Sequence, residues 1–367
     1  MIGQSMHESI RDSDLAPGQR LKNLLASVTL AGTAVLFYAT IPYFQQHVAA
    51  KHQVLSATWS IKDIYLYCVA AYMLLLTLFY LFEPRPGVSK SLHCWRALRR
   101  CLTAPLHTYR VGLPRDERLG LMTVMVKAFF APLMVVFLID HIARLLINGV
   151  GLYGVVSVPD VSAIAAFNSH GFWFALQLIL LVDVGFFTIG YLVELPALKN
   201  EIRSVDPTLL GWLVALMCYP PLNEVTSSIL GWRVEDFPQF DHPAVHIAMG
   251  LAVLVLMAIY AAASAALAFK ASNLTHRGIV RRGPYRYVRH PAYVCKNLAW
   301  WIGAIPALTA ALAVSALDAA MVVVTVLAWS LVYYLRAVTE EDHLRSVDSE
   351  YDDYCAKVPY RFVPRVY

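Results

Sequence analysis

Apolar runs of about twenty residues recur along the chain, and they constrain its fold more than any other feature. The runs lie near 24–44, 62–82, 119–147, 171–194, 208–231, 246–269, 298–313 and 316–336. A run of this length can cross the hydrocarbon core of a bilayer as a helix, because a helix satisfies its backbone polar groups internally. The pattern therefore predicts an all-α, polytopic integral membrane protein with about eight transmembrane helices.

The fifth run differs from the others because Pro220-Pro221 lies near its middle. Each proline lacks a backbone N–H and obstructs the preceding helical turn. We therefore expect the run 208–231 to be kinked or to re-enter the membrane. If it does not cross, seven helices cross and the orientation of the chain beyond this run inverts.

Basic residues are divided unevenly between the two sides of this topology. They gather in the segments 11–22, 85–118, 199–203, 270–289 and 345–365, whereas the opposite side holds Lys51, Lys62 and Arg233. Loops rich in Lys and Arg stay in the cytoplasm. The eight-crossing chain is therefore expected to be a multi-pass protein of the inner (plasma) membrane with both termini cytoplasmic.

Composition and the N-terminal residues bound the function further. The net charge of +5 is spread over these loops, so it does not indicate nucleic-acid binding. Residues 1–23 are polar and lead into an apolar run, which favours a retained membrane helix over a cleaved signal. The six cysteines form no CxxC pair, so we expect free thiols and neither a disulfide framework nor a metal site.

The distribution of polar residues suggests two regions, 1–245 and 246–367. In the first, polar segments connect membrane helices; in the second, polar, aromatic and charged residues crowd against the membrane. Asp140 and Arg144 are one helical turn apart and are expected to form an ion pair. Asp183 has no local partner and is a candidate for lining a polar cavity. The segment 194–207 is expected to form an amphipathic helix on the cytoplasmic surface, and the alternative is that it forms a wall of the site.

The segment from Gly283 to Tyr293 is basic, aromatic and punctuated by proline. Gly283-Pro284-Tyr285 favours a turn, and Pro291 suits the first turn of the next helix. Arg289 and His290 directly precede that helix, whose free N–H groups favour an anion. We therefore expect an anionic group to bind here.

A second charged cluster follows the last apolar run. Arg336 and Glu340 are one turn apart on a continuing helix and share a face, whereas Glu341 points about 100° away. If this cluster meets the first one, arginine can hold a carboxylate while the acids hold an amine, as an amino-acid group requires. The alternative is that these residues only cap and neutralise a helix that leaves the bilayer.

The C-terminal third resembles the isoprenylcysteine carboxyl methyltransferase superfamily, which also includes phospholipid N-methyltransferases. The resemblance runs from about Phe269 to Pro364. It rests on Gly283-Pro284-Tyr285 followed by Arg289-His290-Pro291-Ala292-Tyr293, then on Glu340-Glu341 and on the ending 350–359. The first 245 residues resemble no family that we recognise.

This resemblance implies a membrane enzyme that uses S-adenosylmethionine in a cytoplasmic pocket closed by the C-terminal segment. A lipidic or hydrophobic acceptor, such as an isoprenylcysteine carboxylate, would enter laterally between helices. The cofactor pocket would be shaped by Gly283, Pro284, Tyr285, His290, Pro291 and Tyr293. Glu340 and Glu341 would meet the amino end of the cofactor, and Arg289 and Arg336 would serve catalysis at the carboxylate of cofactor or acceptor.

Two departures from the family pattern leave other functions open. Cys295 replaces a usual glycine and is followed by Lys296, which puts prenylcysteine in doubt as the substrate. The ending 354–367 is also similar to the tail of NADPH-dependent sterol reductases, although the usual Trp-Trp is Pro284-Tyr285 here. A third possibility is a non-enzymatic lipid-binding protein. We favour the methyltransferase because the methyltransferase motifs are better preserved.

Overall fold

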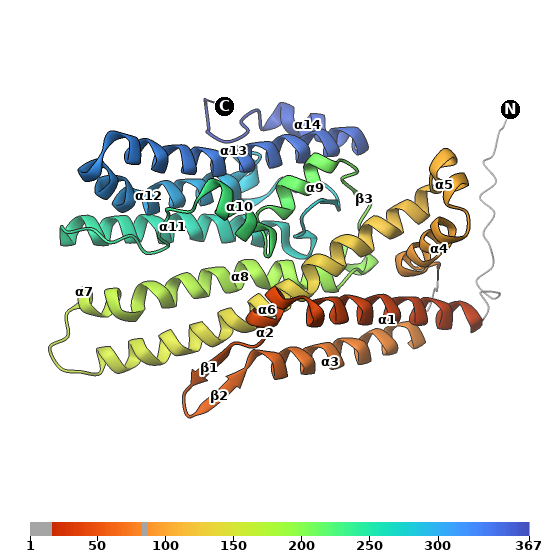
Figure 1. Ribbon diagram of the computed structural model, residues 1–367, viewed down its shortest axis with the longest axis horizontal. Helices are drawn as coiled ribbons and strands as arrows, with labels where there is room; N and C mark the ends of the chain where they lie inside the picture. Colours follow the sequence, from red (N-terminus) through yellow and green to blue (C-terminus); the bar gives the residue numbers. More distant parts are fainter. Residues whose placement is uncertain (1–16, 83–86, 367) are drawn as a thin grey trace. The chain divides into compact units, whose positions relative to one another are not determined.

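The computed structural model describes residues 17–82 and 87–366, and helices make up nearly all of this part of the chain (Figure 1). The N-terminal residues 1–16 and the start of the basic segment 85–118 lie outside the described residues. The α-helices are α1 (Pro17–Thr40), α2 (Pro42–Val48), α3 (Ile61–Phe82), α4 (Lys90–Thr103), α5 (Pro105–Val111), α6 (Arg115–Val156), α7 (Ala163–Ala166), α8 (Phe172–Leu192), α9 (Leu209–Leu216), α10 (Leu222–Leu230), α11 (Pro243–Leu267), α12 (Pro291–Val314), α13 (Ala316–Val347) and α14 (Glu350–Lys357).

Shorter elements connect these helices. A π-helical turn, η1 (Phe167–Gly171), joins α7 to α8. The 3-10 turns are η2 (Pro196–Leu198), η3 (Ala268–Lys270) and η4 (Gly283–Arg286). Two antiparallel strand pairs occur: β1 (Lys51–Val54) with β2 (Ala57–Ser60), and β3 (Ser204–Val205) with β4 (Thr275–His276).

Seven helices of the described chain are long and apolar enough to cross a membrane. They are α1, α3, α6, the continuous stretch Ala163–Leu192, α11 with its 3-10 extension, α12 and α13. This confirms a polytopic helical membrane protein. The fifth apolar run does not form a continuous helix, because it breaks into α9 and α10 on either side of Pro220-Pro221. Each piece rises only about 12–14 Å, less than half of the hydrocarbon core.

The broken segment nevertheless joins the two ends of α11. Before the broken segment, β3 pairs with β4, which follows the C-terminal end of α11. After the broken segment, His242 is the residue that precedes the N-terminal end of α11. Between them, the N–H of Glu235 donates to the carbonyl oxygen of Gly303 in α12 at 3.1 Å. There is no room for a side chain at Gly303, since a Cβ there would lie 2.4 Å from the backbone carbonyl oxygen of Glu235. The chain thus traverses the length of α11 as two short helices and a segment without regular secondary structure.

The chain divides into two compact units. The first comprises the residues up to Ala39 together with Leu66–Phe129, and the second comprises Thr40–Tyr65 and Phe130–Tyr367. In the first unit, α4 packs against α6 at Gly120, where a Cβ would lie 2.6 Å from the Lys90 carbonyl oxygen. Arg100 and Glu117 form a two-point ion pair with both distances 2.9 Å. The predicted boundary at residue 245 stays a prediction.

The second unit is built around four long helices, with α8, α11, α12 and α13 packed side by side in that order (Figure 1). One apolar cluster joins α8, α11 and α12 to the broken segment through Phe237, which stacks on Phe172 at 3.9 Å between ring centres. The expected Asp140–Arg144 ion pair is confirmed at 2.6 Å, and His52 also contacts Asp140 at 2.8 Å.

The prediction of a surface helix over 194–207 was wrong. Only the single turn η2 forms, Lys199 adopts a left-handed conformation at its end, and the chain then extends into β3. Asn200 explains the difference, because its buried side chain binds the backbone of Val193, Leu195 and Phe269. The segment therefore becomes a loop fastened to the end of α8 and α11.

Candidate functional site

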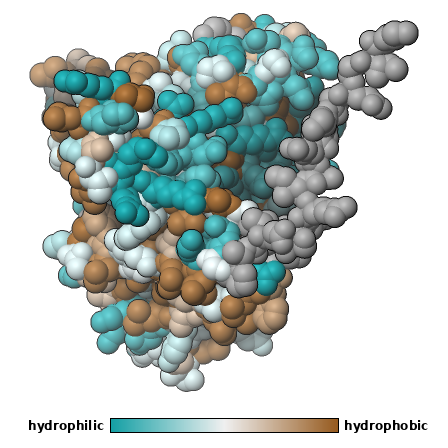
Figure 2. Space-filling view, turned by 90° about the vertical axis from the view of Figure 1, so that its right-hand side faces the viewer, coloured by the Kyte–Doolittle hydropathy of each residue, from teal (hydrophilic) through white to brown (hydrophobic). Residues whose placement is uncertain are grey.

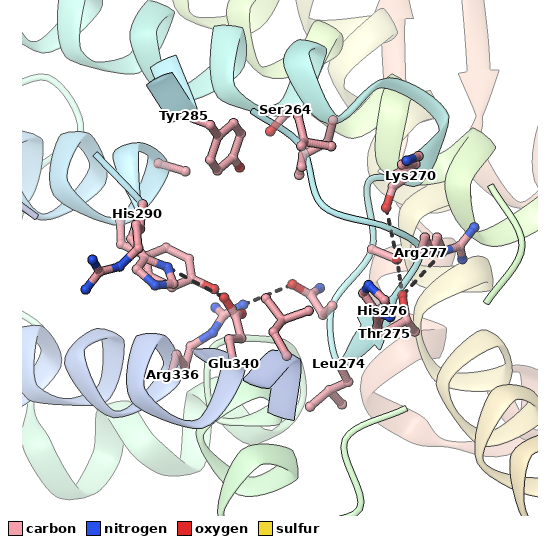
Figure 3. A pocket seen from close by; sticks show the side chains of 18 of the residues that line it. Ser264, Lys270, Leu274, Thr275, His276, Arg277, Tyr285, His290, Arg336 and Glu340 are labelled. Carbon is pink, nitrogen blue, oxygen red and sulfur yellow. Dashed lines mark hydrogen bonds and ion pairs between the residues drawn. The ribbon is translucent and has the colours of Figure 1, made fainter. Parts of the chain in front are cut away.

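A cavity of about 200 Å³ opens at the end of the second unit where α11 and α13 end and α12 begins (Figure 3). Its walls come from α11, the loop 270–280, η4, the first turn of α12, the last turns of α13, α14 and the turn after α9. Figure 2 shows hydrophilic residues gathered on the upper part of the face that it draws. The cavity itself lies where the ends of three long helices of the second unit meet.

The expected turn and helix start position the first charged cluster. Gly283 has φ +59° and opens η4, and α12 begins at Pro291 as predicted. The backbone N–H groups of Arg289 and His290 donate to the carbonyl oxygens of Tyr360 and Arg361, each at 3.0 Å. The C-terminal segment is therefore paired with the stretch that leads into α12.

Glu341, which is fully buried, joins the two charged clusters in an ion-pair network. Its carboxylate accepts hydrogen bonds from Arg289 at 2.9 Å, His290 at 3.1 Å and Arg361 at 2.9 and 3.0 Å. Arg345 adds a contact of 3.0 Å from one turn later on α13. The clusters meet as predicted, but Glu341 lies behind the cavity wall, where it cannot touch a ligand's amino group as the resemblance implied.

Glu340, unlike Glu341, lines the cavity. Its side chain is 33% exposed, accepts a short hydrogen bond from the Tyr293 hydroxyl and lies 3.7 Å from His290 Nδ1. The 100° rotation between adjacent helical residues explains why Glu340 and Glu341 face different surroundings. Tyr293 in turn stacks on His290, with ring centres 5.2 Å apart.

Arg336 is a buried cation without a carboxylate within 4 Å among the described residues. It is 4% exposed, its Nη2 donates to Asn273 at 2.9 Å, and its Nε has no hydrogen-bond partner. The rings of Tyr293 and Tyr333 lie 5.1 and 5.2 Å from its Cζ. Burial of a charge is costly unless it is paired, so this side of the cavity suits an anionic group.

Asp183 stands behind a third part of the wall. Its carboxylate accepts hydrogen bonds from Tyr260, at 2.9 Å, and from Ser264, and these two residues line the cavity. The Nζ atom of Lys296 lies 5.5–5.8 Å from the ring centres of Tyr260, Trp300 and Tyr333. The expectation that Asp183 serves a polar cavity therefore has structural support, although the aspartate acts through two hydroxyl groups.

The predicted site residues separate into two groups. Those that line the cavity are Tyr285, Arg289, His290, Tyr293, Arg336 and Glu340; those that do not are Gly283, Pro284, Pro291 and Glu341. The second group shapes the turn, starts α12 or holds the ion-pair network.

Sequence reasoning missed several aromatic and polar residues of the wall. Asn273, which positions Arg336, also binds the hydroxyl groups of Tyr191 and Tyr219. Tyr351 and Tyr354 come from α14. Burial raises the pKa of Tyr285, Tyr351 and Tyr354 well above the usual range, so all three stay protonated. No local pattern marked Asn273, Tyr191 and Tyr219, because separate segments contribute them, whereas Tyr351 and Tyr354 belong to the ending 350–359 that carries the resemblance.

One family matches the chain, over residues 234–358, and it is described as "Protein of unknown function (DUF1295)". The match covers α11 to α14 with the cavity loop, while α1 to α10 lie outside it. No curated protein matches, and no solved structure matches either. The family description names no reaction, so the resemblance to methyltransferases stays a prediction.

Proposed function

We propose that this protein is a membrane methyltransferase that uses S-adenosylmethionine and a lipidic or hydrophobic acceptor. One observation carries the proposal. Arg336, a buried guanidinium without a carboxylate within 4 Å in the described part of the chain, lies one helical turn before Glu340, and both face the same cavity. This pair of opposite charges suits an amino-acid end group, which carries an ammonium and a carboxylate.

The residues of the cavity fit such a cofactor. Glu340 would hold the amino group, the unpartnered Nε of Arg336 would hold the carboxylate, and His290 would keep Tyr293 in place by stacking. Tyrosine rings surround these groups, and aromatic faces attract cations such as a sulfonium. S-adenosylmethionine would supply an activated methyl group there. The protein's task is then to align the acceptor and exclude water.

The buried network around Glu341 supports this arrangement from behind. It fastens the C-terminal segment to the start of α12, so the wall that carries Arg289, His290 and Tyr293 is held in one position. We therefore regard Glu341 as a positioning residue. The basic segments 199–203, 270–289 and 345–365 belong to this end of the second unit, which favours a cavity that opens to the cytoplasm.

A second candidate is an NADPH-dependent reductase. One observation favours it: Lys270 and Arg277 line the cavity, and cations of this kind can hold a dinucleotide's phosphates. Against it, Arg361 of the reductase-like tail is engaged with Glu341. Arg289 is engaged there too, which leaves fewer cations for a dinucleotide.

Isothermal titration calorimetry on detergent-purified protein can decide between these functions. We expect S-adenosylhomocysteine to bind and NADPH not to bind. Glu340→Gln and Arg336→Gln should each weaken S-adenosylhomocysteine binding by roughly tenfold or more, as expected for a lost charged hydrogen bond.

Asp342→Asn is the matched control for Glu340→Gln. Asp342 is on the same helix, its side chain is 68% exposed, and it does not line the cavity. This variant should bind the ligand like the parent protein. Binding of NADPH alone would refute the methyltransferase, and equal affinity in all three variants would show that the charged pair serves only structure.

A further inference from the structure

Three cations gather around Gly278 on the other side of the cavity from Glu340. A Cβ placed on Gly278 would lie 3.0 Å from Lys270 Nζ and 3.7 Å from Arg203 Cζ, so both charges approach this one residue. Arg277 is its immediate neighbour and lines the cavity with Lys270. We call Arg203, Lys270 and Arg277 the Gly278 cluster. Figure 3 shows Lys270 and Arg277 across the hollow from Arg336 and Glu340.

The local fold explains why these side chains meet. β3 and β4 pair antiparallel, and the Arg203 N–H donates to the His276 carbonyl oxygen at 2.8 Å, which brings Arg203 beside the loop after α11. Gly278 has φ +95°, a conformation that favours glycine. The chain therefore turns sharply where the three cations converge.

The Gly278 cluster has no acidic partner within 4 Å among the residues that the structure describes. Arg277 is 2% exposed; its Nη1 donates to the Asn200 carbonyl oxygen and its Nε to Thr275, while the buried Nη2 has no partner. Two acids lie near the cluster: burial lowers the pKa of Arg277 while the charge of Glu194 opposes that shift, and Asp348 contacts His276 at 3.0 Å. A buried guanidinium with an unused N–H, beside two further cations, is stabilised when an oxyanion binds.

We propose that the Gly278 cluster binds a phosphate group. Phosphate carries up to two negative charges and several acceptor oxygens, which match two guanidinium groups and one ammonium better than a single carboxylate does. The hydroxyl groups of Ser272 and Thr275 also line this part of the cavity. They are hydrogen-bonded to each other, and Thr275 accepts from Arg277, so they help to position the guanidinium.

The phosphate site does not depend on the proposed methyl transfer, because different residues support it. The identity of the molecule that carries the phosphate does rest on the proposed function. With the amino-acid end of the cofactor at Glu340 and Arg336, the phosphate at the Gly278 cluster belongs to the acceptor. The acceptor is then an amphiphile with a phosphate-bearing head group. In a reductase, the same site would hold a phosphate of the dinucleotide.

The test measures binding of dioctanoyl phosphatidate to the purified full chain in detergent, with dioctanoylglycerol, inorganic phosphate and NADPH as separate probes. We expect saturable binding of the phosphatidate, competition by inorganic phosphate, and no saturable binding of dioctanoylglycerol. Lys270→Gln and Arg203→Gln should each weaken phosphatidate binding roughly tenfold. Lys270→Arg keeps the charge and should retain binding.

Arg286→Gln is the matched control, since Arg286 is exposed on η4 and does not line the cavity. Melting temperature and elution volume verify folding of each variant, and the affinity for S-adenosylhomocysteine should not change in Lys270→Gln. NADPH binding that is lost in the same variants would support the phosphate site and assign it to a dinucleotide. No saturable binding of any phosphate probe, or equal losses in Arg286→Gln, would overturn the site.

Discussion

The Glu341→Gln substitution tests whether the buried ion-pair network holds the cavity wall and the C-terminal segment together. Glutamine keeps the shape of the side chain and removes its charge. Glu341 is 0% exposed and its carboxylate contacts Arg289, His290, Arg345 and Arg361. Removal of the negative charge therefore leaves these positively charged side chains close together without the anion that offsets their mutual repulsion.

The exposure of each partner decides how much its lost contact matters. The side chains of Arg289 and His290 are 9% and 7% exposed, and that of Arg361 is 15% exposed. Breaking a buried pair by removing one partner destabilises by about 3–5 kcal/mol. Arg345 is 37% exposed, so its contact adds at most about 1 kcal/mol. We expect Glu341→Gln to lower the free energy of unfolding by about 3–5 kcal/mol.

Thermal unfolding in detergent and limited proteolysis measure the two consequences. The variant should melt at a lower temperature, and trypsin should cleave faster after Lys357, because Arg289 and Arg361 no longer fasten the tail through Glu341. Glu350→Gln is the control: its side chain is 72% exposed and pairs only with Arg281 among the described residues, at 3.2 Å. Equal melting temperatures and equal cleavage rates in the two variants would refute the role of Glu341.

Three further predictions follow from single sites. Burial lowers the pKa of His276, and Asp348 opposes the shift, so the unfolded chain binds the proton more readily than the folded protein does. The free energy of unfolding should therefore fall as the pH drops through about 6.5. Melting curves should show a smaller fall in His276→Gln. Gly190→Ala should destabilise by about 1–3 kcal/mol because its Cβ would lie 2.1 Å from the Ala271 carbonyl oxygen, whereas Gly185→Ala on the same helix has no atom within 4 Å and should not; equal melting temperatures would contradict this. With Cys355 as the sole cysteine, a membrane-impermeant thiol reagent should label it from the cytoplasmic side, and labelling from the other side alone would invert the orientation.

The membrane fold was predictable from sequence because each crossing depends on local composition. A run of apolar residues specifies its helix whatever its neighbours are, and α12 begins at Pro291 for reasons contained in its own first turn. The ion pair of Asp140 and Arg144 is equally local, since both residues lie on one helix. The fifth crossing was harder, because proline indicates where a helix breaks and leaves the path beyond the break open.

That path depends on contacts between distant segments. The extended stretch after α10 is held by Gly303 of α12 and by Trp329 of α13, whose Nε1 donates to the Gly231 carbonyl oxygen at 3.0 Å. Neither partner can be identified from the residues around Glu235. The same holds for the cavity wall, where Asn273 and Tyr219 contribute without any motif of their own.

The charges that line the cavity place a further demand on its ligands. Five cations line it, namely Lys270, Arg277, Arg289, Lys296 and Arg336, and two carboxylates, Asp206 and Glu340. Glu341 neutralises Arg289 from behind. Asp183 and Glu194 lie close enough to Lys296 and Arg277 to offset part of their charge. Under the proposed function, S-adenosylmethionine carries a sulfonium besides its amino-acid group, so it adds no net negative charge to the cavity. The Gly278 cluster then has to be matched by the other ligand, and this is why we propose an acceptor with an acidic head group rather than a cationic one.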